Sequence, residues 1–154
     1  MTLPIITYPN DILRKKAESI DPGQIRSPKI QRLITEMKET LTDNNGLGLA
    51  APQIGESVRL IIVETPASPA GGPDGQLALI NPQIIKKSWR KEINEEGCLS
   101  FPGVYRNIKR PLKVEVRAYD EQGRQLEISA RGLAACEIQH EVDHLNGILI
   151  IDKK

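Results

Sequence analysis

The stretch that decides the fold is residues 139–147, with the sequence Gln-His-Glu-Val-Asp-His-Leu-Asn-Gly. On a helix, His140 and His144 lie four residues apart and share one face, about one turn from each other. Two imidazoles at this spacing can bind a single metal ion, and Glu141 is placed to handle the proton of a metal-bound water. Two ligands leave coordination positions open. The pattern therefore predicts a metal site whose third ligand comes from another part of the chain.

His140 and His144 are the only histidines of the chain. A single histidine is more often a structural residue than a ligand. A glutamate between the only two histidines, at ligand spacing, rarely arises by chance, so metal binding is the better interpretation. The surrounding pattern predicts a helix from about Arg131 to Leu145, ended by Asn146-Gly147.

The composition is typical of a soluble globular protein. The chain has 154 residues, 39% of them hydrophobic and 27% charged, which predicts one domain spanning residues 1–154. The formal net charge of +1 gives no reason to expect a nucleic-acid partner. No apolar run approaches the roughly 18 residues that a membrane span needs, and the N-terminus does not resemble a secretory signal. Cys98 and Cys136 are therefore expected as free thiols or metal ligands in a reducing, cytoplasmic compartment.

Periodicity predicts the main secondary structure. A short helical piece is expected over residues 12–17, and a long helix opens at Ser27-Pro28 and ends at residues 43–46. Apolar residues recur along the long helix at helical spacing, namely Ile30, Leu33, Ile34, Met37 and Leu41. Single strands are expected at 58–63, 77–80, 83–88 and 148–151, and Asn81-Pro82 is expected to separate the second from the third. Residues 66–75 predict a surface loop, and residues 112–119 and 124–130 predict a hairpin.

A second unusual stretch, residues 46–55, reads Gly-Leu-Gly-Leu-Ala-Ala-Pro-Gln-Ile-Gly. Its small residues permit another backbone to come close. A tight loop between helix and strand is one interpretation, and a phosphate-binding loop is a weaker one, because the Gly-Lys-Ser/Thr ending is absent. The amide of Gln53, among these small neighbours, can donate to a developing oxyanion.

Two cysteines compete as the third metal ligand. Cys136, His140 and His144 form one row along the predicted helix, but eight residues place Cys136 about 12 Å along the axis from His144. Metal–ligand bonds of about 2.0–2.3 Å cannot span that separation. Cys98 comes from another segment, beside two glutamates that disfavour a free thiolate unless a cation compensates. Cys98 is therefore the predicted ligand, and Cys136 a pocket wall or packing residue.

Three stretches in chain order, residues 46–53, 96–100 and 139–145, together closely resemble the signature motifs of the peptide deformylase family. The resemblance extends over nearly the whole chain. It implies an α+β fold, with antiparallel and mixed β-sheets packed around a central metal-binding helix and with a long N-terminal helix. It also implies a metal-dependent hydrolase that removes the N-formyl group from the N-terminal formyl-methionine of newly synthesised proteins and releases formate.

The resemblance assigns roles to particular residues. The metal ligands are Cys98, His140 and His144, and the expected ion is Fe²⁺, which Zn²⁺, Ni²⁺ or Co²⁺ can replace. Glu141 takes the proton of the attacking water and delivers it to the departing amine, while the Gln53 amide and the Leu99 backbone N–H meet the oxyanion. The substrate-binding residues it implies, which pair with the extended peptide or wall the methionine pocket, are Gly46, Leu47, Gly48 and Leu133.

Two departures from the family affect what is expected. Many relatives continue into a further C-terminal helix that helps some of them dock on the ribosome, whereas this sequence stops at Lys154. Transient ribosome contact is therefore doubtful, although the partners remain N-formylmethionyl nascent peptides. Cys136 and Glu137 stand where relatives often line the methionine pocket, and a charged Glu137 is unexpected in an apolar pocket.

Other metal-binding classes fit the sequence less well. A metzincin would need a third histidine at position 150, which is Ile150, and no glutamate follows His144 to complete a gluzincin site. A copper-binding or electron-transfer domain could use one cysteine and two histidines, but it would leave Glu141 and Gln53 without a purpose.

Overall fold

The structure, a computed structural model, describes residues 1–64 and 75–153. Along the described chain the elements are η1 (Asp11–Arg14), η2 (Pro22–Gln24), α1 (Pro28–Asp43), β1 (Gly48–Ala50), η3 (Ala51–Ile54), β2 (Leu60–Glu64), β3 (Gln76–Lys87), β4 (Lys91–Cys98), β5 (Phe101–Pro111), β6 (Lys113–Tyr119), β7 (Gln125–Arg131), α2 (Leu133–Leu145) and η4 (Ile150–Asp152).

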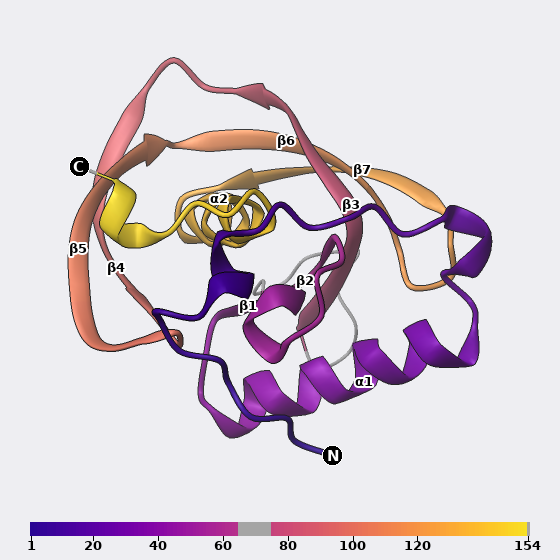
Figure 1. The fold of residues 1–154 in the computed structure, drawn as a ribbon. Helices are drawn as coiled ribbons and strands as arrows, with labels where there is room; N and C mark the ends of the chain where they lie inside the picture. Colours follow the sequence, from indigo (N-terminus) through magenta and orange to yellow (C-terminus); the bar gives the residue numbers. More distant parts are fainter. Residues whose placement is uncertain (65–74, 154) are drawn as a thin grey trace.

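Two antiparallel sheets enclose α2. Five strands form the larger sheet in the order β1-β2-β3-β6-β7, and β4 pairs with β5 in the smaller one. Figure 1 views α2 end-on, with β6 and β7 arching over it and β4 and β5 to one side. The helix contacts strands of both sheets, including β1, β2, β5 and β7. The predicted α+β class with antiparallel sheets is confirmed.

The long helix α1 forms as its sequence predicts. The Ser27 hydroxyl accepts a hydrogen bond from the backbone N–H of Ile30, and Pro28 occupies the first helical position. The predicted apolar stripe is buried along its length. Asn44 caps the C-terminus, and Asn45 follows with a positive φ of 52°. Capping and periodicity together fix both ends of this helix.

Strand β2 is buried on both faces because it lies between the two helices. Side chains alternate along a strand, so Ile61 and Val63 join the hydrophobic cluster around α2, while Leu60 and Ile62 join the cluster around α1. This arrangement explains why the sequence of the strand is a nearly continuous run of apolar residues. It also places β1, the neighbour of β2, directly beside α2.

Several predicted elements were wrong in detail. The two strands expected at 77–80 and 83–88 are one strand, β3, whose pairing with β6 shifts at the supposed break. Asn81 there adopts a positive φ of 53°, and its side chain both donates to and accepts from the backbone of Ile20. Such a bulge preserves the strand although Pro82 lacks an N–H.

Three other segments also differ from expectation. The predicted terminal strand at 148–151 is instead the 3-10 turn η4, where the Asp152 carboxylate accepts from the Leu149 N–H and pairs with Arg14. The helical piece expected at 12–17 is only the short η1. Part of the predicted glycine-rich loop is the strand β1. The hairpin β6–β7 is confirmed, and the loop predicted at 66–75 lies, apart from Gly75, outside the described residues.

Within residues 1–64 and 75–153, no helix combines the length and the apolar character needed to cross a membrane.

Candidate active site

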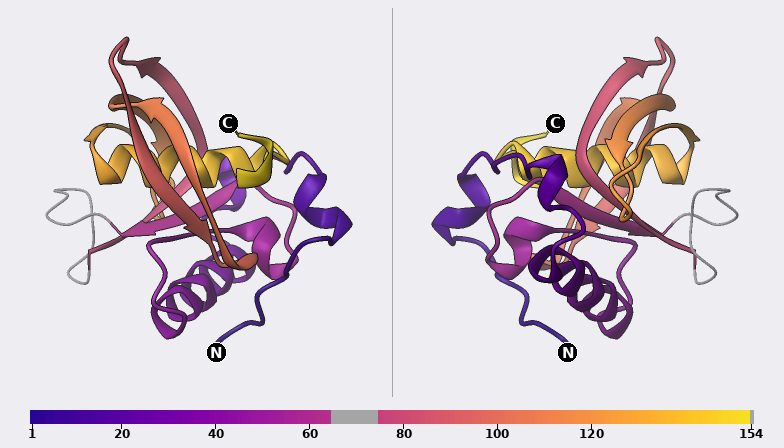
Figure 2. Two further views of the ribbon diagram at one scale, coloured as in Figure 1. Left: turned by 90° about the vertical axis from the view of Figure 1, so that its left-hand side faces the viewer. Right: turned by 90° about the vertical axis from the view of Figure 1, so that its right-hand side faces the viewer.

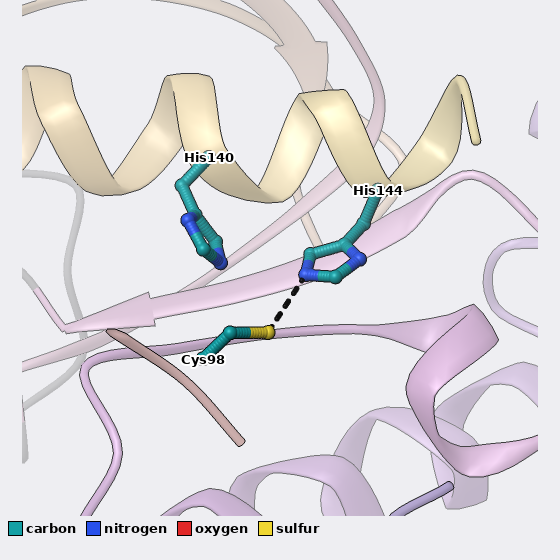
Figure 3. Close-up of side chains that lie close together, drawn as sticks. All are labelled: Cys98, His140 and His144. Atoms are coloured by element: carbon teal, nitrogen blue, oxygen red, sulfur yellow. Dashed lines mark hydrogen bonds between the residues drawn. The ribbon is translucent and has the colours of Figure 1, made fainter. Parts of the chain in front are cut away.

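Cys98, His140 and His144 converge on one point. Cys98 is the last residue of β4, and both histidines project from the same face of α2 (Figure 3). One potential ligand atom from each of the three lies within 4.8 Å of the others, and Cys98 Sγ is 3.2 Å from His144 Nε2. Ligand atoms around a tetrahedral ion are separated by about 3.5 Å, given the usual bond lengths. The donor set and its spacing therefore fit a metal ion.

The surroundings of the two imidazoles are compatible with metal binding. His140 Nδ1 lies 2.9 Å from Glu96 Oε1, so donation of this N–H leaves Nε2 free to bind a cation. His144 is buried, and burial together with the charges of His140 and Arg110 lowers its pKa to about 3. A neutral imidazole keeps the lone pair that coordination uses. The pKa of His140 is shifted the other way, because the effect of burial is outweighed by the neighbouring Glu141, Cys98 and Glu96, which raise it.

Behind His140 lies a buried network that the sequence did not reveal. Arg110 Nη2 donates to Glu96 Oε1 at 2.9 Å, and Arg110 Nη1 donates to Asp143 Oδ2 at 2.8 Å. Cys136 Sγ lies 3.0 Å from Glu96 Oε2, and burial and the Glu96 carboxylate raise the pKa of this thiol to about 12. Cys136 is thus a protonated donor that holds Glu96 in place.

Glu96 is the centre of this network, and its titration predicts sensitivity to acid. Burial opposes ionisation, but hydrogen bonds from His140, Arg110 and Cys136 lower the pKa of Glu96 from 4.5 to about 2.

This lowered pKa predicts that the protein is sensitive to acid. A carboxyl group whose pKa is depressed by folding stabilises the fold at pH values above its ordinary pKa, and this contribution is lost as the pH falls toward 2. We expect wild type to lose about 2 kcal/mol more unfolding free energy than Glu96→Gln between pH 5 and pH 3. Urea unfolding at both pH values measures the free energy of unfolding of the two proteins. Equal losses in wild type and Glu96→Gln would contradict the prediction.

The side-chain amide of Gln53 is fixed at both ends. Its Oε1 accepts from the Ala50 N–H at 2.9 Å, and its Nε2 donates to Ser100 Oγ at 3.1 Å and lies 3.5 Å from Cys98 Sγ. Ser100 Oγ in turn donates to the carbonyl of Ile6 at 2.7 Å. The NH₂ end of Gln53 is thereby held beside Cys98. No sequence pattern indicated this role of Ser100, because its partners Gln53 and Ile6 are distant in the chain.

Glu141 is buried beside the three potential ligands. Its Oε2 lies 4.0 Å from His140 Nε2, and its Oε1 has no hydrogen-bond partner among the described residues. Burial raises the pKa of Glu141 to about 8, opposed by the charge of His140 and assisted by Glu137 and Glu96. A carboxyl group with a pKa near neutrality can both take and return a proton.

Strand β1 approaches Glu141 closely because position 48 is glycine. A Cβ atom at Gly48 would lie 2.5 Å from Glu141 Oε2 and 2.9 Å from its Cγ. Both distances are far below van der Waals contact. Backbone and carboxylate can therefore share this space only if position 48 carries no side chain.

A cavity of about 540 Å³ opens in front of these groups. The four residues predicted to bind substrate, Gly46, Leu47, Gly48 and Leu133, all line it. Other residues in its wall include Gln53, Cys98, Leu99, Glu137, His140 and Glu141. Sequence segments far apart in the chain thus bring a cluster that could hold a metal ion, a buried carboxyl group and a fixed amide to one cavity.

Comparison with known proteins agrees with this geometry. The family profile described as polypeptide deformylase matches residues 2–154. The chain belongs to the peptide deformylase family. Peptide deformylase of Thermodesulfovibrio yellowstonii is 47% identical over 151 residues, which cover 98% of this chain and 88% of that protein. The family removes the N-formyl group from the N-terminal methionine of nascent proteins, so the chain is a metal-dependent deformylating hydrolase.

Solved structures show the same fold. A class I type b peptide deformylase from Acinetobacter baumannii, bound to Met-Ala-Ser, superposes with a TM-score of 0.91 at 33% identity, covering 100% of this chain and 99% of that one. The enzyme from Thermotoga maritima gives a TM-score of 0.90 at 35% identity, with 99% and 97% coverage. The predicted family is therefore confirmed.

Proposed function

We propose that Cys98, His140 and His144 hold one divalent metal ion and that Glu141 carries the proton transfers of deformylation. The observation that supports this most strongly is the convergence of one thiol and two imidazoles beside the buried Glu141 carboxyl group, whose Oε1 has no hydrogen-bond partner among the described residues. We further propose Fe²⁺ as the ion in vivo, with Zn²⁺, Ni²⁺ or Co²⁺ as substitutes, because sulfur with two imidazoles suits all of them. When bound, the ion supplies a Lewis acid that polarises the formyl carbonyl and acidifies water.

Different residues of the cavity then carry out proton transfer and stabilise the oxyanion. Glu141 accepts the proton of the attacking water and returns it to the departing amine, which frees the peptide N-terminus and formate. The amide of Gln53, held by Ala50 and Ser100, donates to the oxyanion that develops on the formyl group, together with the backbone N–H of Leu99. Because Gln53 is already fixed, this donation requires no rearrangement.

Strand β1 offers a place for the peptide. It is an edge strand of the larger sheet, paired with β2 on one side only among the described strands. We propose that the peptide lies extended along Gly46, Leu47 and Gly48 and adds a strand there. The exposed side chain of Leu133, on the cavity wall, then contacts the methionine. The Acinetobacter relative, which has the same fold, is bound to Met-Ala-Ser, and this supports a short peptide as the ligand.

The test is anaerobic purification followed by metal analysis and a formate assay. We expect about one metal ion per chain and release of formate from formyl-Met-Ala-Ser, with acetyl-Met-Ala-Ser as the unreactive control. Protein that contains no ion after anaerobic purification, and releases no formate when Fe²⁺ is added, would contradict the proposal.

The cellular setting is part of the same proposal. N-formylmethionyl nascent peptides are the substrates, and the cytoplasm, where they are made, is the proposed location of this single domain.

Gly48→Ala tests whether the close approach of β1 matters. The new Cβ would occupy the place of the Glu141 carboxylate and displace it. Because a displacement of about 1 Å can cost roughly 100-fold in rate, we expect kcat to fall by about that factor while the metal content is unchanged. Gly23→Ala is the control, since its nearest neighbour would be 3.5 Å away. Equal kcat in the two variants would show that β1 tolerates a side chain here.

Glu137→Val tests the unexpected carboxyl group of the pocket. Glu137 lines the cavity, burial raises its pKa, and none of the described side chains pairs with it. An apolar methionine side chain gains from an apolar wall, so we expect KM for formyl-Met-Ala-Ser to fall by roughly fivefold, with little change in kcat. Glu137→Gln keeps the size and polarity and should leave KM closer to wild type. A higher KM for the valine variant would mean that the acid itself assists binding.

A further inference from the structure

The turn between β3 and β4 projects from the rest of the molecule, as Figures 1 and 2 show from three directions. At this turn Trp89 is 97% exposed, the highest exposure among the large hydrophobic side chains of the described chain. Tryptophan usually buries most of its surface, and its exposed ring is a common anchor for partners. This turn plays no part in the cavity described above.

Positive charge surrounds this tryptophan. Six exposed cationic residues lie on the turn or on the strand ends beside it, namely Lys86, Lys87, Arg90, Lys91, Lys113 and Arg131. Sheet pairing gathers them, because Lys87 pairs in register with Val114, and Lys113 with Arg131. The adjacent acidic residues are Glu92 and Glu115, the latter 3.5 Å from Lys86 Nζ. We call Trp89 and these six cations the Trp89 surface.

The Trp89 surface is rigid at its base. Ser88 N–H donates to the Lys113 carbonyl at 2.9 Å, and the Lys113 N–H donates back to Ser88 Oγ at 3.0 Å. Ser88 Oγ also donates to the Arg90 carbonyl at 2.7 Å. Beside this junction, three lysines and one acid, namely Lys86, Lys87, Lys113 and Glu115, are among the residues that line a hollow of about 320 Å³. The backbone that carries the cations is thus held in place before any partner arrives.

We propose that the Trp89 surface binds single-stranded RNA, with a base stacked on Trp89 and phosphates on the surrounding cations. An exposed aromatic ring within a cluster of cations is the combination that single-stranded nucleic acids require. The net charge of +1, which suggested no nucleic-acid partner, averages over the whole chain and conceals this local excess.

An anionic membrane is a less suitable partner. Membrane adsorption grows with the apolar area that can be inserted, and Trp89 is the only large apolar side chain of the surface. The next exposed large apolar side chain in sequence is Ile93, which is 62% exposed and lies further along β4, opposite Lys109. The position of the surface also suits RNA binding during catalysis. Lys91 and Cys98 stand at opposite ends of β4, about 23 Å apart along an extended strand, so the cavity stays open.

The test uses the full chain and a fluorescein-labelled twelve-nucleotide oligouridylate, with binding followed by anisotropy. If about four phosphates are neutralised, affinity should fall roughly 50-fold between 50 and 200 mM salt. We expect Lys87→Glu/Arg90→Glu to weaken binding by at least about tenfold, and Trp89→Ala by about five- to tenfold. Arg26→Glu/Lys29→Glu is the matched control, because it changes the net charge equally at exposed residues beside the start of α1. Formate release from formyl-Met-Ala-Ser should be the same in all of these proteins, which separates this surface from the catalytic site.

Each alternative result overturns the proposal. Equal weakening by the control pair would mean that RNA responds only to overall charge. Unchanged affinity of Trp89→Ala would remove the stacking role. Binding to phosphatidylglycerol vesicles without binding to the oligouridylate would identify the surface as a membrane contact instead.

Discussion

Purified Cys98→Ala protein is expected to contain no bound metal ion and to release formate at a rate lower by at least three orders of magnitude. Cys98 supplies the only sulfur of the three-residue cluster, and it comes from β4, whereas both imidazoles come from α2. Without this thiolate, two neutral imidazoles remain, which bind a divalent ion far more weakly. The activity falls with the ion, because the ion acidifies the attacking water, an effect on the order of 10³-fold or more.

Cys136→Ala is the matched control for this experiment. Its thiol contacts Glu96 and none of the three clustered residues, so the variant should keep the metal ion and most of the activity while losing some stability. Metal analysis and formate release are measured on both proteins after anaerobic purification. Retention of metal by Cys98→Ala, or its loss from Cys136→Ala, would reverse the assignment of the two cysteines.

Glu141→Ala is expected to retain the metal ion and to lose formate release by about 10²- to 10⁴-fold, the usual contribution of a positioned acid or base. The carboxyl group is not one of the three clustered residues, and its Oε1 has no hydrogen-bond partner in the described structure, so removing that oxygen breaks no hydrogen bond there. Removing a buried, unsatisfied carboxyl group should not lower the melting temperature.

Glu141→Gln separates proton transfer from the loss of volume. It keeps the shape of the side chain but cannot accept the proton, so its activity should be as low as that of Glu141→Ala. Metal content, melting temperature and formate release are measured together. A glutamine variant with wild-type activity would exclude Glu141 as the base, and the site would then resemble a metal-binding module with another source of protons.

The two variants also test different parts of the proposal. Cys98→Ala removes the ion and Glu141→Ala keeps it, so a loss of activity in both, with metal lost in only one, assigns binding to the thiol and proton transfer to the carboxylate. Loss of metal in both would instead indicate that the cluster and Glu141 form one cooperative unit.

Much of the architecture could be predicted because it depends on patterns among residues that are close in sequence. The 3.6-residue period of α1, its Ser27-Pro28 start and the alternation along β6 and β7 depend on neighbours in sequence, so they were predicted correctly. The same holds for His140 and His144, whose common face follows from helical geometry alone. Helical geometry also placed Cys136 too far from His144 to share a metal ion with it, so Cys98 was the remaining candidate. The structure places Cys98 beside both histidines.

Elements that depend on distant partners were missed. A bulge at Asn81 is stabilised by Ile20, and the turn at Ile150–Asp152 by Arg14, contacts that no local pattern indicates. Strand β1 has too few residues to show alternation, and it is recognisable only through its pairing with β2.

The sequence by itself determined which side chains can bind a metal ion and which helix carries two of them, because ligand type and helical spacing are properties of adjacent residues. Only the tertiary structure decided how those side chains are held. Glu96 and Arg110 come from paired strands and contact α2 through His140 and Asp143, and Gly48 makes room for Glu141 from a third segment. Burial and approach distance arise when segments far apart in the chain pack together, and no single stretch of sequence contains them.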